Sequence, residues 1–344
     1  MKKNKNSLRI LRIQRVFKQH EFYLFIVIVI YSIFIAFLNP NFISLENLFD
    51  LGKSSAVMGI MAVGVFVVLL SGGIDLSFTA IAISGQYIAA NALIASGVDN
   101  IFLAFLISCT VGISLGAING FLISHYKIPT LIATLGTSSV FHGALLTIVG
   151  TRAINAAQLP NCFKILGSYN VFVLTKPNGV EYGMSVFVLI FIFIALLTWI
   201  ILKYTMLGRG VYAIGGDLNA AIRSAFNVRG IQFFIYCYVG FLAGIAGVLH
   251  ISLIRYGNPT YLVGDELNVI AAVVLGGTRI TGGTGTVIGT IMGMAMLTIL
   301  NNSLILVGLS SYWHTFFVGL IIVISVSITS YQNSKSTGNI TLRK

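Results

Sequence analysis

Long hydrophobic runs separated by short polar stretches form the main pattern of this chain. Because about 20 apolar residues cross a bilayer as a helix, the runs predict an all-α polytopic membrane protein with about ten transmembrane helices. The 266–278 run is short, and the runs at 52–71 and 76–95 are divided only by SGGIDLS, so a re-entrant segment could replace a span at either place. The predicted spans are 22–38, 52–71, 76–95, 101–124, 129–150, 184–203, 231–254, 266–278, 284–302 and 312–329.

Composition supports this assignment and excludes the soluble classes of protein. Hydrophobic residues make up 57% of the 344 positions and charged residues 9%, whereas a soluble domain carries about 25% charged residues. The net charge of +12 would suggest nucleic acid in a soluble protein, but basic residues also collect in the cytoplasmic loops of membrane proteins. We therefore expect a lipid bilayer around the chain and no nucleic-acid partner.

The distribution of basic residues predicts the orientation. In a ten-span arrangement that starts inside, 16 of the 21 Lys and Arg residues fall on the cytoplasmic side, as the positive-inside rule requires. Both termini are therefore predicted to be cytoplasmic. The expected units are a basic tail at 1–21, a single transmembrane domain at 22–330 and a second tail at 331–344. Within the domain, 204–230 forms a cytoplasmic loop, and 151–183 forms an external segment that packs over the outer mouth.

Two glycine-rich breaks follow similar apolar leads, VVLLSGGIDLS at 67–77 and AVVLGGTRITGGTGT at 272–286. Such backbone is tolerated at membrane depth only beside protein or water. The breaks could therefore line or gate a translocation path. They could instead be cytoplasmic turns, in which Asp75 caps the third span and Thr281 or Thr284 caps the ninth. The candidate residues of the path are Gly72, Gly73, Asp75, Gly276, Gly277, Gly282 and Gly283.

Three further stretches place glycine at every fourth position, a spacing that lets helix backbones approach closely in lipid. They predict a tightly packed bundle, with either a sliding or a static interface. The stretches contain Gly112, Gly116 and Gly120, then Gly240 and Gly244, then Gly285, Gly289 and Gly293.

A polar island, GRGVYAIGGDLNAAIRSAFNVRG at 208–230, lies between two apolar runs. Its centre, DLNAAIRSAFNV, predicts a short helix capped by Asp217 or Asn219. Spanning a membrane does not require such a segment, so it is expected to contact something on the cytoplasmic side.

The remaining polar residues favour transport over catalysis. Asp75 is the only acid close to the interior of an apolar span, and the three cysteines show neither metal spacing nor a disulfide framework. No complete phosphate-binding or dinucleotide fingerprint is present, and no cofactor is expected. Neutral amides within the spans suit a neutral, hydroxyl-rich solute, although amides also join helices. The candidate residues of the solute path are Gln86, Asn91, Asn119 and Asn268.

Four stretches together resemble the permease subunits of bacterial sugar ABC importers, the group that contains the ribose, galactoside, xylose and autoinducer-2 systems. They are LLSGGIDLS, GAINGFLISHYKIPTLIATLGT, GRGVYAIGGDLNAAIRSAFNV and VIAAVVLGGTRITGGTGTVIGTIMG, and the likeness extends over about residues 40–330. The chain departs from the family pattern at Asp217, where Asn is usual, at Ala225 and Phe226, and at Arg279.

The resemblance implies a multi-pass inner-membrane subunit that works by alternating access and has no ATPase site of its own. It implies three partners: an ATP-binding cassette subunit, an external solute-binding protein and a second permease copy, identical or related. The polar island would be the coupling helix that fits a cleft on the ATP-binding subunit. Its expected contact residues are Asp217, Asn219, Ala220, Ala221 and Arg223.

The residues within the spans give less support to two other classes of protein. A self-sufficient secondary carrier needs buried ionisable residues that couple transport to an ion, and the spans offer few. A membrane-embedded enzyme needs His, Asp or Glu clustered at one depth, and the sequence shows no such cluster.

Overall fold

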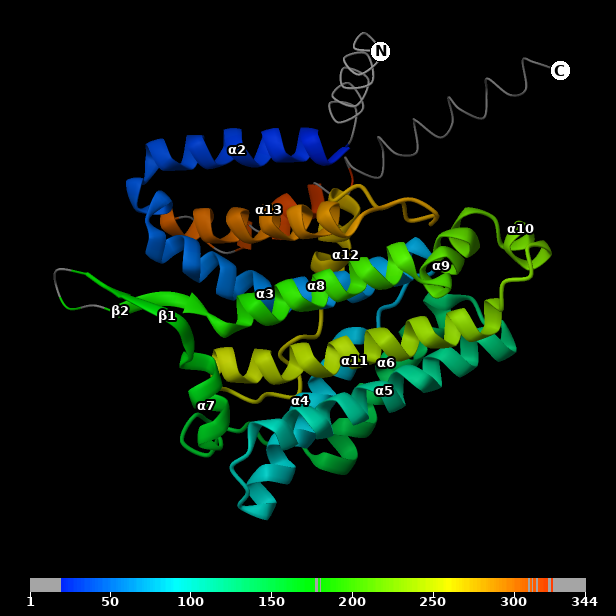
Figure 1. The fold of residues 1–344 in the computed structure, drawn as a ribbon. Helices are drawn as coiled ribbons and strands as arrows, with labels where there is room; N and C mark the ends of the chain where they lie inside the picture. Colours follow the sequence, from blue (N-terminus) through cyan, green and yellow to red (C-terminus); the bar gives the residue numbers. More distant parts are fainter. Residues whose placement is uncertain are drawn as a thin grey trace, which may run out of the picture.

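The hydrophobic runs fold as long helices in the computed structural model, which describes residues 20–323 apart from 177, 178, 180, 309, 311, 314, 321 and 322. The prediction of an all-α polytopic fold is confirmed (Figure 1). The elements in chain order are α2 (His20–Leu38), η1 (Pro40–Ile43), α3 (Leu45–Leu70), α4 (Phe78–Ser96), α5 (Ile101–Tyr126), α6 (Thr130–Ala144), η2 (Leu145–Val149), α7 (Asn161–Ser168), β1 (Asn170–Thr175), β2 (Glu181–Ser185), α8 (Val186–Tyr204), α9 (Met206–Gly216), α10 (Leu218–Arg223), α11 (Val228–Ile254), α12 (Glu266–Leu275) and α13 (Val287–Leu306).

Among the described residues, eight helices are long and apolar enough to cross a membrane, fewer than the ten predicted spans. The predicted span at 266–278 is only the ten-residue helix α12, which is about 15 Å long against a hydrocarbon core of about 30 Å. Half of the predicted span at 312–329 and nearly all of the tails at 1–21 and 331–344 lie outside the described residues. The orientation of the termini remains a prediction.

A run of turns at 259–265 leads from α11 to the short helix α12. After α11, Gly257 pairs with Ile154 through two backbone hydrogen bonds of 2.8 and 2.9 Å, beside α7. The chain then runs inward to α12 and reaches the second glycine break beside α9.

Different structures cap the two ends of the bundle. At one end, which we call the hairpin end, α7 lies next to the antiparallel hairpin of β1 and β2 (Figure 1). The helices α9 and α10 lie at the opposite end, which we call the α10 end. The sequence predicted packing for 151–183 but no strands. The hairpin end is tied to α3 because Lys53 donates a hydrogen bond to the Gly167 carbonyl at 2.7 Å, and Lys176 forms an ion pair with Glu46.

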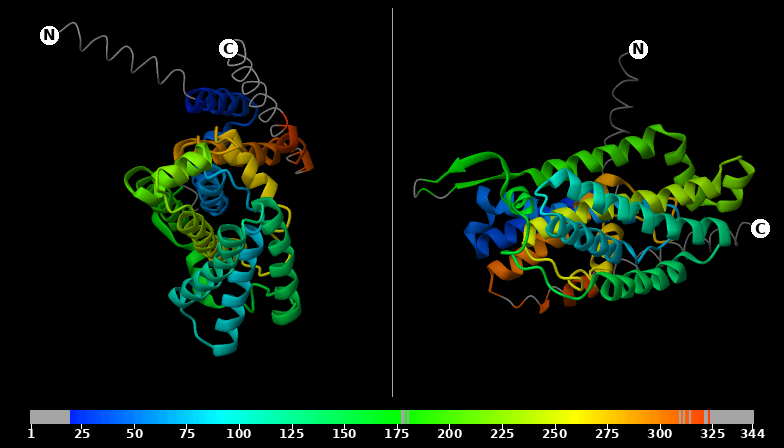
Figure 2. Two further views of the ribbon diagram at one scale, coloured as in Figure 1. Left: turned by 90° about the vertical axis from the view of Figure 1, so that its right-hand side faces the viewer. Right: turned by 90° about the horizontal axis from the view of Figure 1, so that it is seen from below.

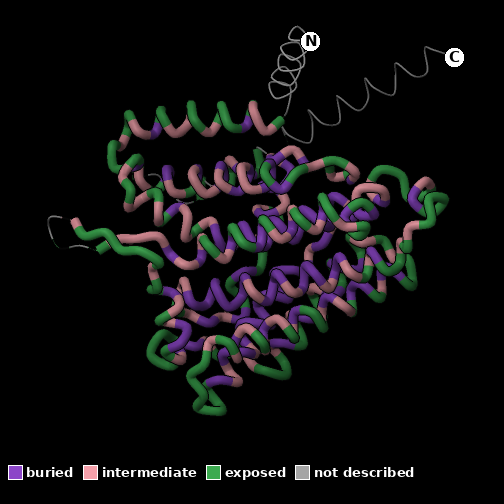
Figure 3. The backbone as a smooth tube through the Cα atoms, in the orientation of Figure 1, coloured by how far each residue is buried: buried purple, intermediate pink, exposed green. Residues whose placement is uncertain are grey.

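The core is centred on α3, α4 and α11, whose residues are largely buried (Figure 3). The glycine spacing has the predicted effect. A Cβ atom added to Gly112 would lie 2.1 Å from the Gly240 carbonyl oxygen, and one added to Gly116 would lie 2.3 Å from that of Tyr236. Only glycine permits this approach of α5 to α11, so the prediction of close helix packing is confirmed.

The first long helix, α2, lies at the edge of the bundle beside α13 (Figure 2). Only Leu24 and Ile35 of α2 are buried. Its apolar side chains are therefore available to lipid, and a hydrogen bond of 2.7 Å between the Tyr31 and Ser303 hydroxyls joins it to α13.

Candidate functional site

The polar island folds as two helices, α9 and α10, joined at Asp217. Thr205 caps α9 by accepting a hydrogen bond from the Gly208 N–H at 3.1 Å. The Asp217 carboxylate caps α10 by accepting from the N–H groups of Asn219 at 2.8 Å and Ala220 at 3.1 Å. The predicted short helix and its cap at Asp217 are confirmed.

The residues predicted to contact a partner do not share one face of α10. Asn219 and Arg223 are exposed, but Ala221 is 2% exposed and faces the bundle. Ala221 packs against its own chain, and its expected contact with a partner stays a prediction. Sequence reasoning missed Leu218 and Ile222, which are 45% and 55% exposed. Their spacing of four residues, which puts two apolar side chains on one helix face, is the signal that could have identified them.

Close backbone packing anchors α9. A Cβ atom on Gly208 would lie 2.3 Å from the Cα atom of Leu202, and one on Gly210 would lie 2.3 Å from the Cδ1 atom of Ile231. The helix is therefore wedged between α8 and α11, and it carries α10 on its far end.

The two glycine breaks meet at the α10 end. The Gly283 N–H donates to the Leu70 carbonyl at 2.9 Å, and a Cβ atom on Gly282 would lie 2.6 Å from the Gly72 nitrogen. Gly72 and Gly282 have φ values of +82° and +88°, a region that favours glycine. Three of the seven predicted gate residues are thus brought together.

The other glycines of the predicted gate lie apart from this meeting point. A Cβ atom on Gly73 would approach the Tyr236 hydroxyl at 3.1 Å, and one on Gly276 would lie 2.3 Å from the Gly289 carbonyl oxygen. Gly277 lies beside the His20 ring. These contacts pack the breaks against α11, α13 and α2 respectively.

The first break continues as a non-helical segment, 74–77, held by α6. The Thr130 hydroxyl accepts from the Ile74 N–H at 3.0 Å, and the Thr134 hydroxyl accepts from the Leu76 N–H at 3.2 Å. Backbone groups that a helix would satisfy internally are therefore satisfied by threonines of a neighbouring helix. This is the condition for irregular backbone within a membrane bundle.

Asp75 lies in this non-helical segment and is 1% exposed. Its carboxylate accepts from the Ser77 N–H at 2.7 Å and from the Ser77 hydroxyl at 2.6 Å, and that hydroxyl accepts from the Asn119 amide at 2.7 Å. Asp75 therefore belongs to a buried polar network and does not cap the third span, because α4 begins after Ser77.

The ninth predicted span also has a different cap. The Thr286 hydroxyl accepts from the Gly289 N–H at 3.0 Å at the start of α13. The predicted caps Thr281 and Thr284 lie earlier in the loop, because α13 begins only after Thr286, the last residue of the second break.

The four predicted path amides have different surroundings. The Gln86 side-chain oxygen accepts a hydrogen bond from His250 Nδ1 at 3.0 Å inside the contact between α4 and α11, and Asn91 donates to the Tyr87 carbonyl of its own helix at 2.8 Å. Asn119 belongs to the buried network around Asp75. Asn268 lines a pocket.

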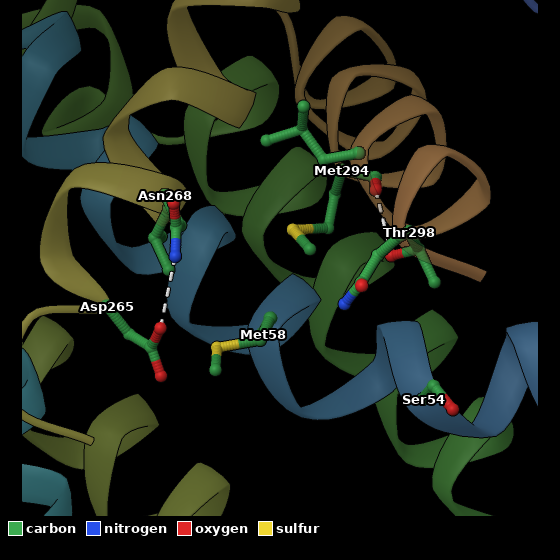
Figure 4. A pocket seen from close by; sticks show the side chains of 9 residues that line it. Ser54, Met58, Asp265, Asn268, Met294 and Thr298 are labelled. Carbon is green, nitrogen blue, oxygen red and sulfur yellow. Dashed lines mark hydrogen bonds between the residues drawn. The ribbon is translucent and has the colours of Figure 1, made fainter. Parts of the chain in front are cut away.

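The pocket, of about 150 Å³, lies between α3, α12 and α13 (Figure 4). In Figure 4, Asp265 and Asn268 on the α12 side face Met294 and Thr298 of α13 across Met58 of α3. The Asn268 amide donates to the Asp265 carboxylate at 3.1 Å. Sequence reasoning missed Asp265, because it lies where an apolar span begins. The pocket is lined by Ser54, Met58, Asp265, Asn268, Val269, Met294, Leu297, Thr298 and Asn301.

The comparison with protein families decides the class of this bundle. A family model described as the permease component of the branched-chain amino acid transport system matches residues 47–326. The chain belongs to this permease family. With eight helices able to cross a bilayer, the permease is a multi-pass membrane protein.

Curated relatives extend the match over most of the permease. This chain is 37% identical over 304 residues to the ribose import permease protein RbsC of Bacillus subtilis, and the match covers 88% of this chain and 89% of that protein. It is 32% identical over 292 residues to RbsC of Escherichia coli, covering 85% and 88%. The galactose/methyl galactoside import permease protein MglC of Haemophilus influenzae is 31% identical, with 92% and 96% covered. No solved structure matches the permease.

Proposed function

We propose that this permease is the transmembrane subunit of an ABC importer and carries a sugar, or a similar neutral polyhydroxylated solute, inward by alternating access. The observation that carries the proposal is the likeness, over at least 85% of this chain, to permeases named for ribose and galactoside import. The alternative of a self-sufficient secondary carrier receives no support from these relatives.

The pocket beside α12 is the part of the structure that best suits such a solute. Sugar hydroxyls both donate and accept hydrogen bonds. The Asp265 carboxylate is an acceptor, the amides of Asn268 and Asn301 are donors and acceptors, and the Thr298 hydroxyl is both. Methionine side chains of α3 and α13 provide an apolar wall for the C–H faces of a sugar ring.

The importer class implies partners on both sides of the membrane. An ATP-binding cassette subunit would engage α10 on the cytoplasmic side, through the exposed face that contains Leu218, Ile222 and Arg223. A solute-binding protein would dock outside, near the hairpin end. A second permease copy, identical or related, would complete the pathway in the inner membrane.

In this proposal the permease hydrolyses no ATP itself. The stretch LGKSS resembles the end of a phosphate-binding loop, but Gly52, Lys53 and Ser54 lie within the helix α3. Helical backbone commits its N–H groups to its own carbonyls, so it cannot form the cradle of free N–H groups that binds phosphate.

The test is uptake by inverted and right-side-out proteoliposomes that contain the permease, its ATP-binding subunit and its binding protein. We expect labelled ribose or galactoside to accumulate only with ATP on the side of α10. Accumulation of leucine but neither sugar would overturn the sugar assignment. Uptake driven by an ion gradient without the ATP-binding subunit would establish the carrier alternative instead.

A further inference from the structure

A third glycine pair joins the two breaks at the α10 end. Gly215 and Gly216 end α9, immediately before Asp217. A Cβ atom on Gly215 would lie 1.9 Å from the Leu70 carbonyl oxygen and 2.5 Å from the Gly283 nitrogen. Gly215 is therefore in backbone contact with the first break and the second break at once. We call Leu70, Gly72, Gly215, Gly282 and Gly283 the glycine junction.

No side chain separates the backbones at the glycine junction. A Cβ atom on Gly282 would lie 3.0 Å from the Cα atom of Gly215, as well as 2.6 Å from the Gly72 nitrogen. The hydrogen bond from Gly283 to Leu70 holds the two breaks together at 2.9 Å. Close-packed contacts of this kind resist compression. A displacement of one backbone segment of the junction must therefore move the other segments.

A second contact connects α9 to the far end of the second break. The Tyr212 hydroxyl donates to the Gly285 carbonyl at 3.1 Å, one residue before the Thr286 cap of α13. Tyr212 and Gly215 lie almost one turn apart on α9, so the same helix face touches both ends of the loop between Gly282 and Gly285.

The corner between α9 and α10 is short and hydrogen-bonded. The Asp217 N–H donates to the Ala213 carbonyl at 3.0 Å to end α9, while the Asp217 carboxylate begins α10. No flexible linker lies between Gly215 and α10, so a movement of α10 reaches the glycine junction within two residues.

We propose that Gly215 is the transmission point of the permease, where a movement of α10 is passed by backbone contact to both glycine breaks. The break after α3 leads to the Asp75 network, and the break after α12 leads to the helix that lines the pocket. The proposal rests on the proposed function in one respect, that α10 receives the ATP-driven movement.

Gly215→Ala tests the junction, and Gly216→Ala is its matched control. A Cβ atom on Gly216 meets nothing within 4 Å, so the control adds the same methyl group one residue away without a clash. In the assembled importer, we expect Gly215→Ala to lower ATP-driven uptake about 5- to 150-fold, the range of typical coupling free energies. Basal ATP hydrolysis and co-purification with the ATP-binding subunit should persist, but stimulation of hydrolysis by loaded binding protein should be lost.

A third variant keeps the test independent of folding. Tyr212→Phe removes the hydrogen bond to Gly285 and adds no atoms. We therefore expect it to lower the stimulation of hydrolysis by loaded binding protein, as Gly215→Ala does, and it can be measured even if Gly215→Ala fails to assemble. The proposal would be overturned by wild-type uptake in Gly215→Ala, or by equal losses of uptake in Gly215→Ala and Gly216→Ala. Where Gly215→Ala does not assemble, normal stimulation of hydrolysis in an assembled Tyr212→Phe protein would overturn it. Failure of the proposed function would show differently, because the wild-type importer itself would lack ATP-driven sugar uptake.

Discussion

The exposed apolar face of α10 leads to a quantitative prediction about partner binding. Ile222 is 55% exposed, and complete burial of an isoleucine side chain contributes about 1.5–3 kcal/mol. Covering the exposed fraction at an interface should therefore contribute about 0.8–1.7 kcal/mol. Ile222→Ala should weaken association with the ATP-binding subunit by up to about 4- to 18-fold.

The assay is a titration of the ATP-binding subunit onto the permease in nanodiscs, read as a dissociation constant. Ile165 supplies the control, since it is 62% exposed but lies on α7 at the hairpin end. Ile165→Ala should leave the dissociation constant unchanged. An Ile222→Ala protein that binds as tightly as wild type, or equal weakening by both substitutions, would refute the assignment of this face to the partner.

Three other predictions concern the pocket, the hairpin end and the orientation. Asn268→Leu should lower sugar uptake about tenfold or more, as expected when a hydrogen-bonding group of a site is lost. Asn91→Leu should retain uptake, because the Asn91 amide bonds to the Tyr87 carbonyl of its own helix, and equal uptake by both would remove Asn268 from the path. The pKa of the Cys162 thiol is raised to about 12, mainly by burial and to a smaller extent by the neighbouring Asp99 carboxylate. Little thiolate therefore forms at pH 8. Replacing Asp99 with Asn in a background without the other two cysteines should lower that pKa and speed maleimide labelling, and an unchanged rate would contradict the Asp99 contribution. Reporters inserted at Asp99 and Asp217 should report opposite sides of the membrane, with Asp217 inside, and the reverse result would invert the proposed docking sides.

The hydrophobic pattern by itself determined the class of protein and most of its spans. The ability to cross a bilayer depends on about 20 consecutive residues, so it can be read locally. The cap at Asp217 was equally predictable, because the carboxylate and the N–H groups it binds are at most three residues apart. The glycine spacing of Gly112 and Gly240 indicated close packing, although not which helices would meet.

Only the tertiary structure decided which distant segments come together. The meeting of Gly72, Gly215 and Gly282 could not be read from the sequence, because a glycine has no side chain to indicate its partner and these three are far apart in the chain. The inward direction of Ala221 depends on how α10 rests on the bundle. The pocket at Asn268 likewise forms because the short helix α12 packs against α3 and α13, and such packing is a property of the whole bundle.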